Sequence, residues 1–442
     1  MSISCKKDLN FIALIAIVIG SQIGSGAFTL PTLLAPTKTI GLLGWLVSVS
    51  GAIALALVFS DLASHLPKNG GPHVYVAEAF GKGASFFTAW VYWIISWSSS
   101  SILLITAIGY LTTITGPLST ITILLLETSI LLLITYVNII GMKFSGIIET
   151  ILTGCKLAPL IVLPFIFFMF FDLDYFKIPL KEAVDDTDIL SIITKTALLT
   201  FWGFIGVECA TTPAESVCNP KKTIPRAIII GTSCVAIIYI VNTVSVVGVV
   251  GFDVLAASKA PYAVVMNRIF AHSSDIAISI MAIIVCIGTL NAWTLTSGQI
   301  ASGAYSDGLF PKIFGKTNRS GAPTMALLIS AFGMIPFLCI EQMECWKNGL
   351  EKLIDLLVSI FIYVYLICCI SYMKLISRWK QKRSEKIKAQ VLAQIAAIFC
   401  IFVLSHDMIS SIIVLGVFIA AGIPVLYSRR KKCAAEAIKM EE

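Results

Sequence analysis

Apolar runs of membrane-spanning length recur about twelve times along this chain, since a crossing needs about twenty apolar residues. Of the 442 residues, 57% are hydrophobic and only 13% are charged. Because helices satisfy every backbone group inside lipid, the runs predict an all-α polytopic membrane protein. The runs are 11–34, 41–64, 85–112, 118–139, 144–171, 189–215, 225–250, 275–303, 322–340, 352–375, 388–405 and 409–428.

The placement of basic residues predicts the orientation of the spans, since Lys and Arg favour cytoplasmic loops. With alternating spans, the basic stretches fall on one side and the acid-rich stretch at 172–188, with Glu341 and Glu344, on the other. The net charge of +7 therefore reports orientation rather than a nucleic-acid partner, and both termini are expected to be cytoplasmic. The basic stretches are 6–7, 221–226, 312–319, 374–388 and 429–432.

Glycines interrupt two of the runs at matching places. Ile23-Gly24-Ser25-Gly26-Ala27-Phe28 breaks the first run, and Trp202-Gly203-Phe204-Ile205-Gly206-Val207-Glu208 breaks the sixth. A broken helix is tolerated in a membrane only where protein or a polar cavity satisfies its backbone. One break in each half predicts a midplane site between two inverted repeats of five helices each.

The predicted inverted repeats and the remaining segments together make up a single membrane domain. Residues 8–172 and 189–376 form the two inverted repeats, 388–428 form two peripheral spans, and 429–442 form a cytoplasmic tail. The glycines could instead serve close helix packing, but their density and the matching break favour binding. Half-helix N–H groups suit a carboxylate and freed carbonyls suit an ammonium, so the site fits an amino acid.

Two ionisable residues lie at membrane depth. Glu208 follows the second break and must face a cavity or a partner. It could neutralise a cationic substrate or bind a proton; alternatively, it sits at the interface and pairs with Lys221 or Arg226. Lys156 could snorkel to the cytoplasmic interface, or form an internal ammonium wedged against spans 1 and 8 that replaces a coupling cation.

Aromatic residues cluster near the breaks. Trp202 and Trp293 lie near mid-span, and Tyr92 lies in the third span. Interfacial belts account for many membrane aromatics. A mid-span tryptophan beside a broken helix can also stack on a cationic group and close the pathway.

Other classes of protein find little support. The sequence holds no HExxH, GxSxG or phosphate-binding GxxxxGK[ST] motif, so we expect neither an enzyme nor a primary pump. The twelve cysteines are scattered without a CxxC pair, which favours buried hydrophobes over a metal site. No cofactor is expected. A nutrient sensor without transport activity is a remaining, distant alternative.

These motifs resemble the amino acid–polyamine–organocation transporter superfamily, and within it the bacterial arginine/agmatine and putrescine/ornithine antiporters. The resemblance covers most of the chain, from about residue 8 to the tenth span, and implies a LeuT-type fold with a 5+5 inverted repeat. It is carried by residues 24–28, 30–31, 70–71, 202–208, 219–225, 293–294 and 306–312.

The resemblance implies a bacterial cytoplasmic (inner) membrane protein whose partners are an amino acid or polyamine and the bilayer; the sequence leaves room for a homodimer. It implies gates and a pH-sensitive group at Tyr92, Trp202, Glu208 and Tyr365, and a platform at Trp293. The expected substrate-binding set is Ile23, Gly24, Ser25, Gly26, Ser96, Ser100, Trp202, Ile205, Glu208, Trp293 and Leu357.

Three positions depart from the antiporters. Ser100 stands where they have an amide, Leu357 where they have a hydroxyl, and Lys156 is similar to the lysine of sodium-independent permeases. The leading hypothesis is therefore a secondary transporter for a cationic amino acid, or an exchanger of that amino acid for an amine, working by alternating access. The alternative is a proton-coupled symporter of broader or neutral specificity.

Overall fold

The computed structural model describes residues 9–177, 188–258, 260–270, 275–341, 350–379 and 382–441, and most of these are helical. Within these ranges no strand forms, and the extended backbone at Leu9 makes one isolated bridge to Val217. The prediction of an all-α polytopic protein is confirmed. The basic residues 6–7 and most of the acid-rich stretch lie outside the described residues.

The first half of the described chain runs through the broken first span to the end of the fifth. Its elements are α1 (Phe11–Gln22), α2 (Gly26–Leu34), η1 (Ala35–Thr37), α3 (Lys38–His65), α4 (Pro72–Phe80), α5 (Lys82–Ser98), α6 (Ser100–Thr115), α7 (Thr120–Ile140), α8 (Met142–Phe168) and η2 (Leu173–Phe176).

The second half begins with another broken span. Its elements are α10 (Ile189–Phe201), η3 (Trp202–Phe204), η4 (Cys209–Thr211), η5 (Ala214–Ser216), α11 (Pro220–Val250), α12 (Phe252–Ala256), α13 (Pro261–Phe270), α14 (Asp275–Ser306), η6 (Lys312–Gly315), α15 (Thr324–Glu341), α16 (Leu350–Arg378), α17 (Arg383–Leu404) and α18 (Met408–Glu441).

Ten helical segments among the described residues are long and apolar enough to cross a membrane, and Thr324–Ile340 is a shorter apolar helix. One of the ten, Phe11–His65, has 55 residues, about twice the length that a single crossing needs. That segment contains α1, α2 and α3 and has room for two crossings. The chain is an integral membrane protein; the tally of twelve spans and the inverted repeat stay predictions.

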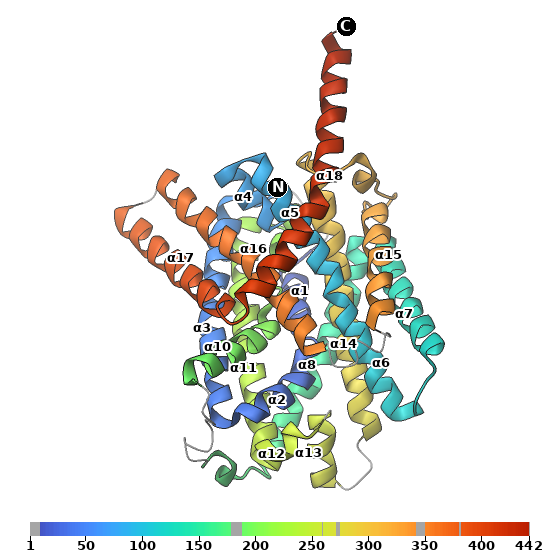
Figure 1. Ribbon diagram of the computed structural model, residues 1–442, viewed down its shortest axis with the longest axis vertical. Coiled ribbons are helices and arrows are strands. Elements are labelled where there is room, and N and C mark those ends of the chain that lie inside the picture. The colour runs from blue at the N-terminus through green and yellow to red at the C-terminus, as the bar shows by residue number, and fades with distance from the viewer. Residues whose placement is uncertain are drawn as a thin grey trace, which may run out of the picture.

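The broken helices lie inside the bundle. α1 packs against α8, α11 and α14, while α10 packs against α3, α16 and α17 (Figure 1). The segment Met408–Tyr427 of α18 is only 11% buried, against 72% for Lys82–Thr115. α18 therefore lies on the outside of the bundle, where it packs on α5 and α16.

Loops from both halves meet at one end of the molecule. His73 at the start of α4 lies 3.1 Å, Nε2 to Oδ2, from Asp307, just beyond α14. Figure 1 shows α4 and the far end of α18 at the upper end of the bundle, and α12 and α13 at the lower end. This placement agrees with spans that alternate in direction; the cytoplasmic identity of the upper end stays a prediction.

Candidate binding site

The first span breaks where the glycines predict it. α1 ends at Gln22, Ile23 has extended backbone (φ −85°, ψ 102°), and α2 starts at Gly26. The break is buried, so lipid does not reach it. The two half-helices therefore depend on the surrounding protein for the backbone groups that an unbroken helix would pair internally.

Four side chains satisfy the carbonyls released at the end of α1. Lys156 Nζ donates to the Gly20 carbonyl (2.8 Å), Trp293 Nε1 to that of Ser21 (3.1 Å) and the Tyr239 hydroxyl to that of Gln22 (3.0 Å). The Thr289 hydroxyl donates to the Ile23 carbonyl. These donors come from α8, α11 and α14, so three neighbouring helices hold the broken end of α1.

The sixth span is irregular over a longer stretch. α10 ends at Phe201, Ile205 is extended, and short 3-10 turns continue to Ser216. Gly206 has φ +107°, and a Cβ there would lie 2.6 Å from Ser21 Oγ. Ser21 donates to the Gly206 carbonyl (3.3 Å). The second break thus needs glycine to touch the first, and the two breaks meet.

A small cavity lies where the breaks meet. Its free volume of about 20 Å³ has room for about one water molecule, so the lining side chains are closed around it in this conformation. None of its lining residues is charged. They are Ser21, Gln22, Gly24, Ser25, Ser99, Leu103, Trp202, Ile205, Thr289 and Trp293.

Two buried polar atoms of this lining have no hydrogen-bond partner within the described part of the chain: Ser25 Oγ and Gln22 Oε1. The other end of the Gln22 amide donates to Thr232 Oγ1 (3.0 Å), which leaves Oε1 as an acceptor. Buried polar groups are normally paired. Ser25 also precedes the N-terminus of α2, where the helix dipole favours an anion. The lining thus offers an acceptor suited to an ammonium and a helix N-terminus suited to a carboxylate.

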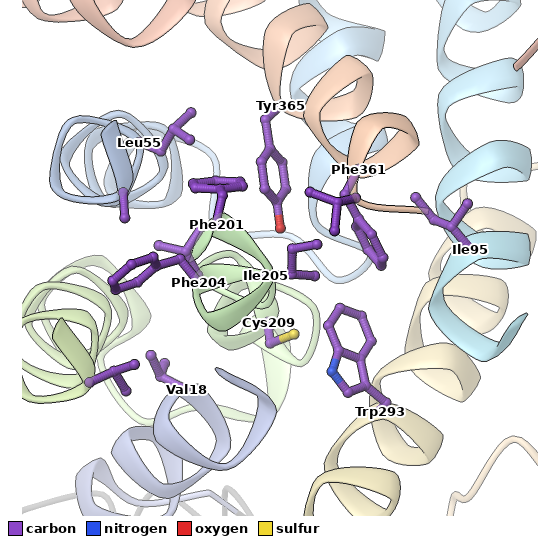
Figure 2. Close-up of a cluster of buried hydrophobic side chains, with 14 of the residues drawn as sticks. Val18, Leu55, Ile95, Phe201, Phe204, Ile205, Cys209, Trp293, Phe361 and Tyr365 are labelled. Atoms are coloured by element: carbon purple, nitrogen blue, oxygen red, sulfur yellow. The ribbon is translucent and has the colours of Figure 1, made fainter. Parts of the chain in front are cut away.

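Aromatic rings form one wall of the cavity. Trp293 packs against Phe361 on α16, with ring centroids 5.3 Å apart. Figure 2 shows Trp293 and Phe361 facing each other, with Tyr365 one turn along α16 and its hydroxyl pointing toward Ile205. Because the Trp293 indole N–H is held by the Ser21 carbonyl, its ring has a fixed position beside the break.

Glu208 is buried between two tyrosines. The Tyr92 hydroxyl donates to Oε1 (2.6 Å) and the Tyr365 hydroxyl to Oε2 (2.5 Å). Tyr365 also accepts from the Gly206 N–H (3.2 Å). Among the described residues Glu208 makes no ion pair, so the interfacial pairing with Lys221 or Arg226 is not observed. The three side chains join α5, α16 and the second break.

The start of α4 covers Tyr92, Glu208 and Tyr365, which together are called the tyrosine layer. The Gly70 N–H donates to the Thr212 carbonyl (3.0 Å), and a Cβ on Gly71 would lie 3.0 Å from Thr211 Oγ1. Gly71 also has φ +76°, a conformation that favours glycine. The side chains between the cavity and the end of the bundle that carries α4 are therefore packed together and buried.

Lys156 lies inside the protein rather than at an interface. Its side chain is fully buried, and its ammonium contacts the Gly20 carbonyl and Thr289 Oγ1 (3.4 Å). It thus bridges α1 and α14, the helices of spans 1 and 8. This is the internal position predicted as one of the two alternatives for Lys156. Its carboxylate neighbour, Glu149 (3.6 Å), is also buried.

Five of the predicted binding residues line the cavity: Gly24, Ser25, Trp202, Ile205 and Trp293. The others lie nearby in different roles. Ile23 gives its carbonyl to Thr289, and a Cβ on Gly26 would lie 3.0 Å from Trp202 Cδ1. Glu208 belongs to the tyrosine layer.

The predicted residues of the third and tenth spans are placed differently. Ser99 lines the cavity. Ser96 donates instead to the Trp93 carbonyl within α5, and Ser100 at the start of α6 donates to the Ser96 carbonyl of α5. Ser100 lines a separate small cavity behind Trp293, and buried Leu357 lines neither of the two.

Sequence reasoning missed Thr289, Tyr239, Phe361 and Glu149. Thr289 and Tyr239 act through contacts between distant spans, which no local pattern reveals. Glu149 carries a detectable signal, because Glu149, Thr153 and Lys156 follow the i, i+4, i+7 spacing of one helix face. A carboxylate on the same helix face as a buried lysine, two turns away, predicts an internal ion pair.

The chain belongs to the amino acid permease family, whose model matches residues 9–428. This is a family of transporters rather than enzymes, so the prediction of a transport protein is confirmed.

Individual relatives narrow the comparison. The chain is 29% identical to the cadaverine/lysine antiporter of Escherichia coli K12 over 99% of this chain and 98% of the relative. It is 27% identical to the arginine/ornithine antiporter of Pseudomonas aeruginosa (98% and 92%) and 28% identical to the putrescine transporter PotE of E. coli K12 (74% of each). The relatives are antiporters or transporters of basic amino acids and polyamines.

Proposed function

We propose that this protein exchanges a cationic amino acid, such as lysine, arginine or ornithine, for a related amino acid or its amine product. Exchange proceeds by alternating access at the cavity between the two breaks. Ser25 Oγ and Gln22 Oε1 carry this proposal, because both belong to residues that line the cavity and neither has a hydrogen-bond partner among the described residues. The substrates for which the relatives are named support the substrate class.

The cavity suggests how the two ends of the substrate are held. The carboxylate lies at the N-terminus of α2 near Ser25, and the α-ammonium donates to Gln22 Oε1. The cationic end lies against Trp293 and Trp202, whose faces attract cations. Since no carboxylate lines the cavity, a diamine and an amino acid can exchange without displacing a fixed counter-ion.

The contacts around the two breaks support the gating roles proposed here. Tyr92, Glu208 and Tyr365 form the gate on the α4 side, and Glu208 is its pH-sensitive member. Trp202 is the gate beside the first half-helix. Lys156 supplies a positive charge beside the first break, in the place of a coupling cation, so sodium is not needed for transport.

A second function is favoured by the uncharged lining of the cavity. A proton-coupled, sodium-independent symporter for neutral amino acids would use the same backbone site. In that case the side chain would fill the space near Leu103 and Ile205, and a proton on Glu208 or Lys156 would drive uptake.

A substrate screen in liposomes separates the two functions. Purified protein is reconstituted with internal unlabelled substrate, and uptake of labelled lysine, arginine, ornithine, putrescine, cadaverine, leucine and alanine is measured with and without sodium or proton gradients. We expect uptake of cationic substrates that needs internal substrate and no gradient. Uptake of leucine or alanine driven by a proton gradient, without internal substrate, would establish the symporter instead.

A further inference from the structure

A buried ion pair lies beside the first break. Glu149 and Lys156 on α8 are both 0% exposed, and Lys156 Nζ lies 3.6 Å from Glu149 Oε1. They are seven residues apart and share the helix face that packs on α1 and α14. The ammonium is closer to the Gly20 carbonyl (2.8 Å) than to the carboxylate. The pair therefore acts on α1 as well as on itself.

Every oxygen of the Glu149 carboxylate has a donor. Oε1 accepts from the Thr153 hydroxyl (3.1 Å) and faces Lys156, and Oε2 accepts from Asn291 Nδ2 on α14 (2.7 Å). The Thr153 hydroxyl also lies 3.2 Å from the Ala16 carbonyl of α1. The carboxylate is thus bonded directly to α14 and linked to α1 through the Thr153 hydroxyl.

The hydrogen bonds continue to a fourth helix. Asn138 Nδ2 on α7 donates to Asn291 Oδ1 (3.0 Å), and the Ser145 hydroxyl donates to Asn138 Oδ1 (2.6 Å). A continuous chain of polar contacts therefore runs from the Gly20 carbonyl through Lys156, Glu149 and Asn291 to Asn138. This chain links the broken end of α1 to α7, α8 and α14.

Two glycines make room for the pair. A Cβ on Gly20 of α1 would lie 1.9 Å from Glu149 Oε1, and a Cβ on Gly288 of α14 would lie 2.9 Å from Lys156 Cε. At both glycines the added Cβ would collide with the side chain of the ion pair itself, Glu149 or Lys156. The helices are shaped to hold this carboxylate and ammonium close together.

We propose that Glu149 is a positioning residue for transport: its carboxylate holds the Lys156 ammonium on the Gly20 carbonyl and so fixes the broken end of α1. Lys156 alone would be an uncompensated charge in the membrane interior. With Glu149 the site beside the break is net neutral, and the ammonium is fixed by a charged partner. This inference rests on the proposed exchange.

Chemical rescue tests the role of the carboxylate. The variants are Lys156→Ala, Glu149→Gln, the double variant, and Lys143→Ala at the exposed start of α8 as a control. Exchange is measured in liposomes with and without sodium or ethylammonium ions, beside equilibrium substrate binding and thermal unfolding. We expect Glu149→Gln and Lys156→Ala each to slow exchange by about tenfold or more, while Lys143→Ala stays at the wild-type rate.

The added cation should restore exchange in Lys156→Ala, because Glu149 remains to hold it, and should fail in the double variant. Rescue of both variants, rescue of neither, or wild-type exchange by Glu149→Gln would overturn the proposal.

A measurement without transport keeps the two proposals separate. We expect Glu149→Gln to raise hydrogen–deuterium exchange of the backbone amides at 20–26 several-fold, while Lys143→Ala leaves it unchanged. Unchanged protection of this segment in Glu149→Gln would count against the positioning role, even if the wild-type protein exchanged no cationic substrate. Failure of the wild-type protein to exchange would instead refute the proposed function.

Discussion

The side chain of Gln22 divides its two ends between the scaffold and the cavity. Nε2 donates to Thr232 on α11, and Oε1, at the cavity, has no hydrogen-bond partner in the described ranges of the chain. Such a residue is pre-oriented, since the bond to Thr232 fixes which end of the amide faces the substrate. The carbonyls of residues 20–23 already accept hydrogen bonds from other side chains. Gln22 Oε1 is therefore the acceptor beside the break that is left for a substrate ammonium.

Gln22→Met should weaken substrate binding by about tenfold or more, because a hydrogen bond to a charged group contributes about 1.5–3 kcal/mol. Equilibrium binding of labelled lysine measures the effect. Thr232→Val is the control: it removes the anchor and leaves the cavity lining in place, so it should have the smaller effect. Equal affinity of Gln22→Met and wild type would contradict the assignment of the α-ammonium.

Trp293→Leu should reduce the preference for cationic over neutral substrates. Loss of the ring face removes a cation–π contact of about 0.5–2 kcal/mol, or roughly two- to thirty-fold in relative affinity. Competition of lysine and leucine for the same labelled substrate gives this ratio. Trp90→Leu, which acts on the contact with α18 instead, should leave the ratio unchanged. A ratio unaffected by Trp293→Leu would place the cationic end elsewhere.

At the scale of helices, the sequence predicts the two breaks well and their partners poorly. Glycine clusters inside apolar runs are local signals, and both interruptions lie where residues 23–26 and 202–208 predict them. The donors to the Gly20–Ile23 carbonyls are more than 130 residues away in sequence, on other helices. Which side chain reaches which carbonyl depends on helix rotation and packing, so Tyr239 and Thr289 could not be assigned from the pattern.

Gly20→Ala should separate α1 from α8. The added methyl would overlap Glu149 Oε1, and overpacking of this kind costs about 1–3 kcal/mol. We expect a lower unfolding temperature and slower exchange. Gly154→Ala on α8 is the matched control, because nothing lies within 4 Å of its added Cβ. Equal stability of the two variants would mean that α1 can move away from α8 at no cost.

At the scale of the whole molecule, the proposed exchange requires substrate to pass between the cavity and the end of the bundle that carries α4. The tyrosine layer around Glu208 and the covering start of α4 block one route from the cavity. Opening that route requires the contacts of Tyr92 and Tyr365 to Glu208 to separate together, because all three residues lie on different elements. If exchange proceeds as proposed, we therefore expect a concerted change in α5, α16 and the second break.

The orientation of the molecule can be tested with fusions at the C-terminus. The distribution of Lys and Arg predicts that this end is cytoplasmic. A C-terminal green fluorescent protein should therefore fluoresce in bacterial cells, and a C-terminal alkaline phosphatase should be inactive. The reverse pattern would place the α4 end of the bundle, with its tyrosine layer, on the opposite side of the membrane.

The proposed exchange requires that one cavity between the breaks binds cationic amino acids and amines in turn. Efflux of labelled cadaverine from liposomes, measured with and without external lysine, tests it most directly. We expect efflux to depend on external lysine and to be lost in Gln22→Met at low lysine concentration. Efflux at the same rate without external lysine, or only with a sodium or proton gradient, would contradict exchange at this site.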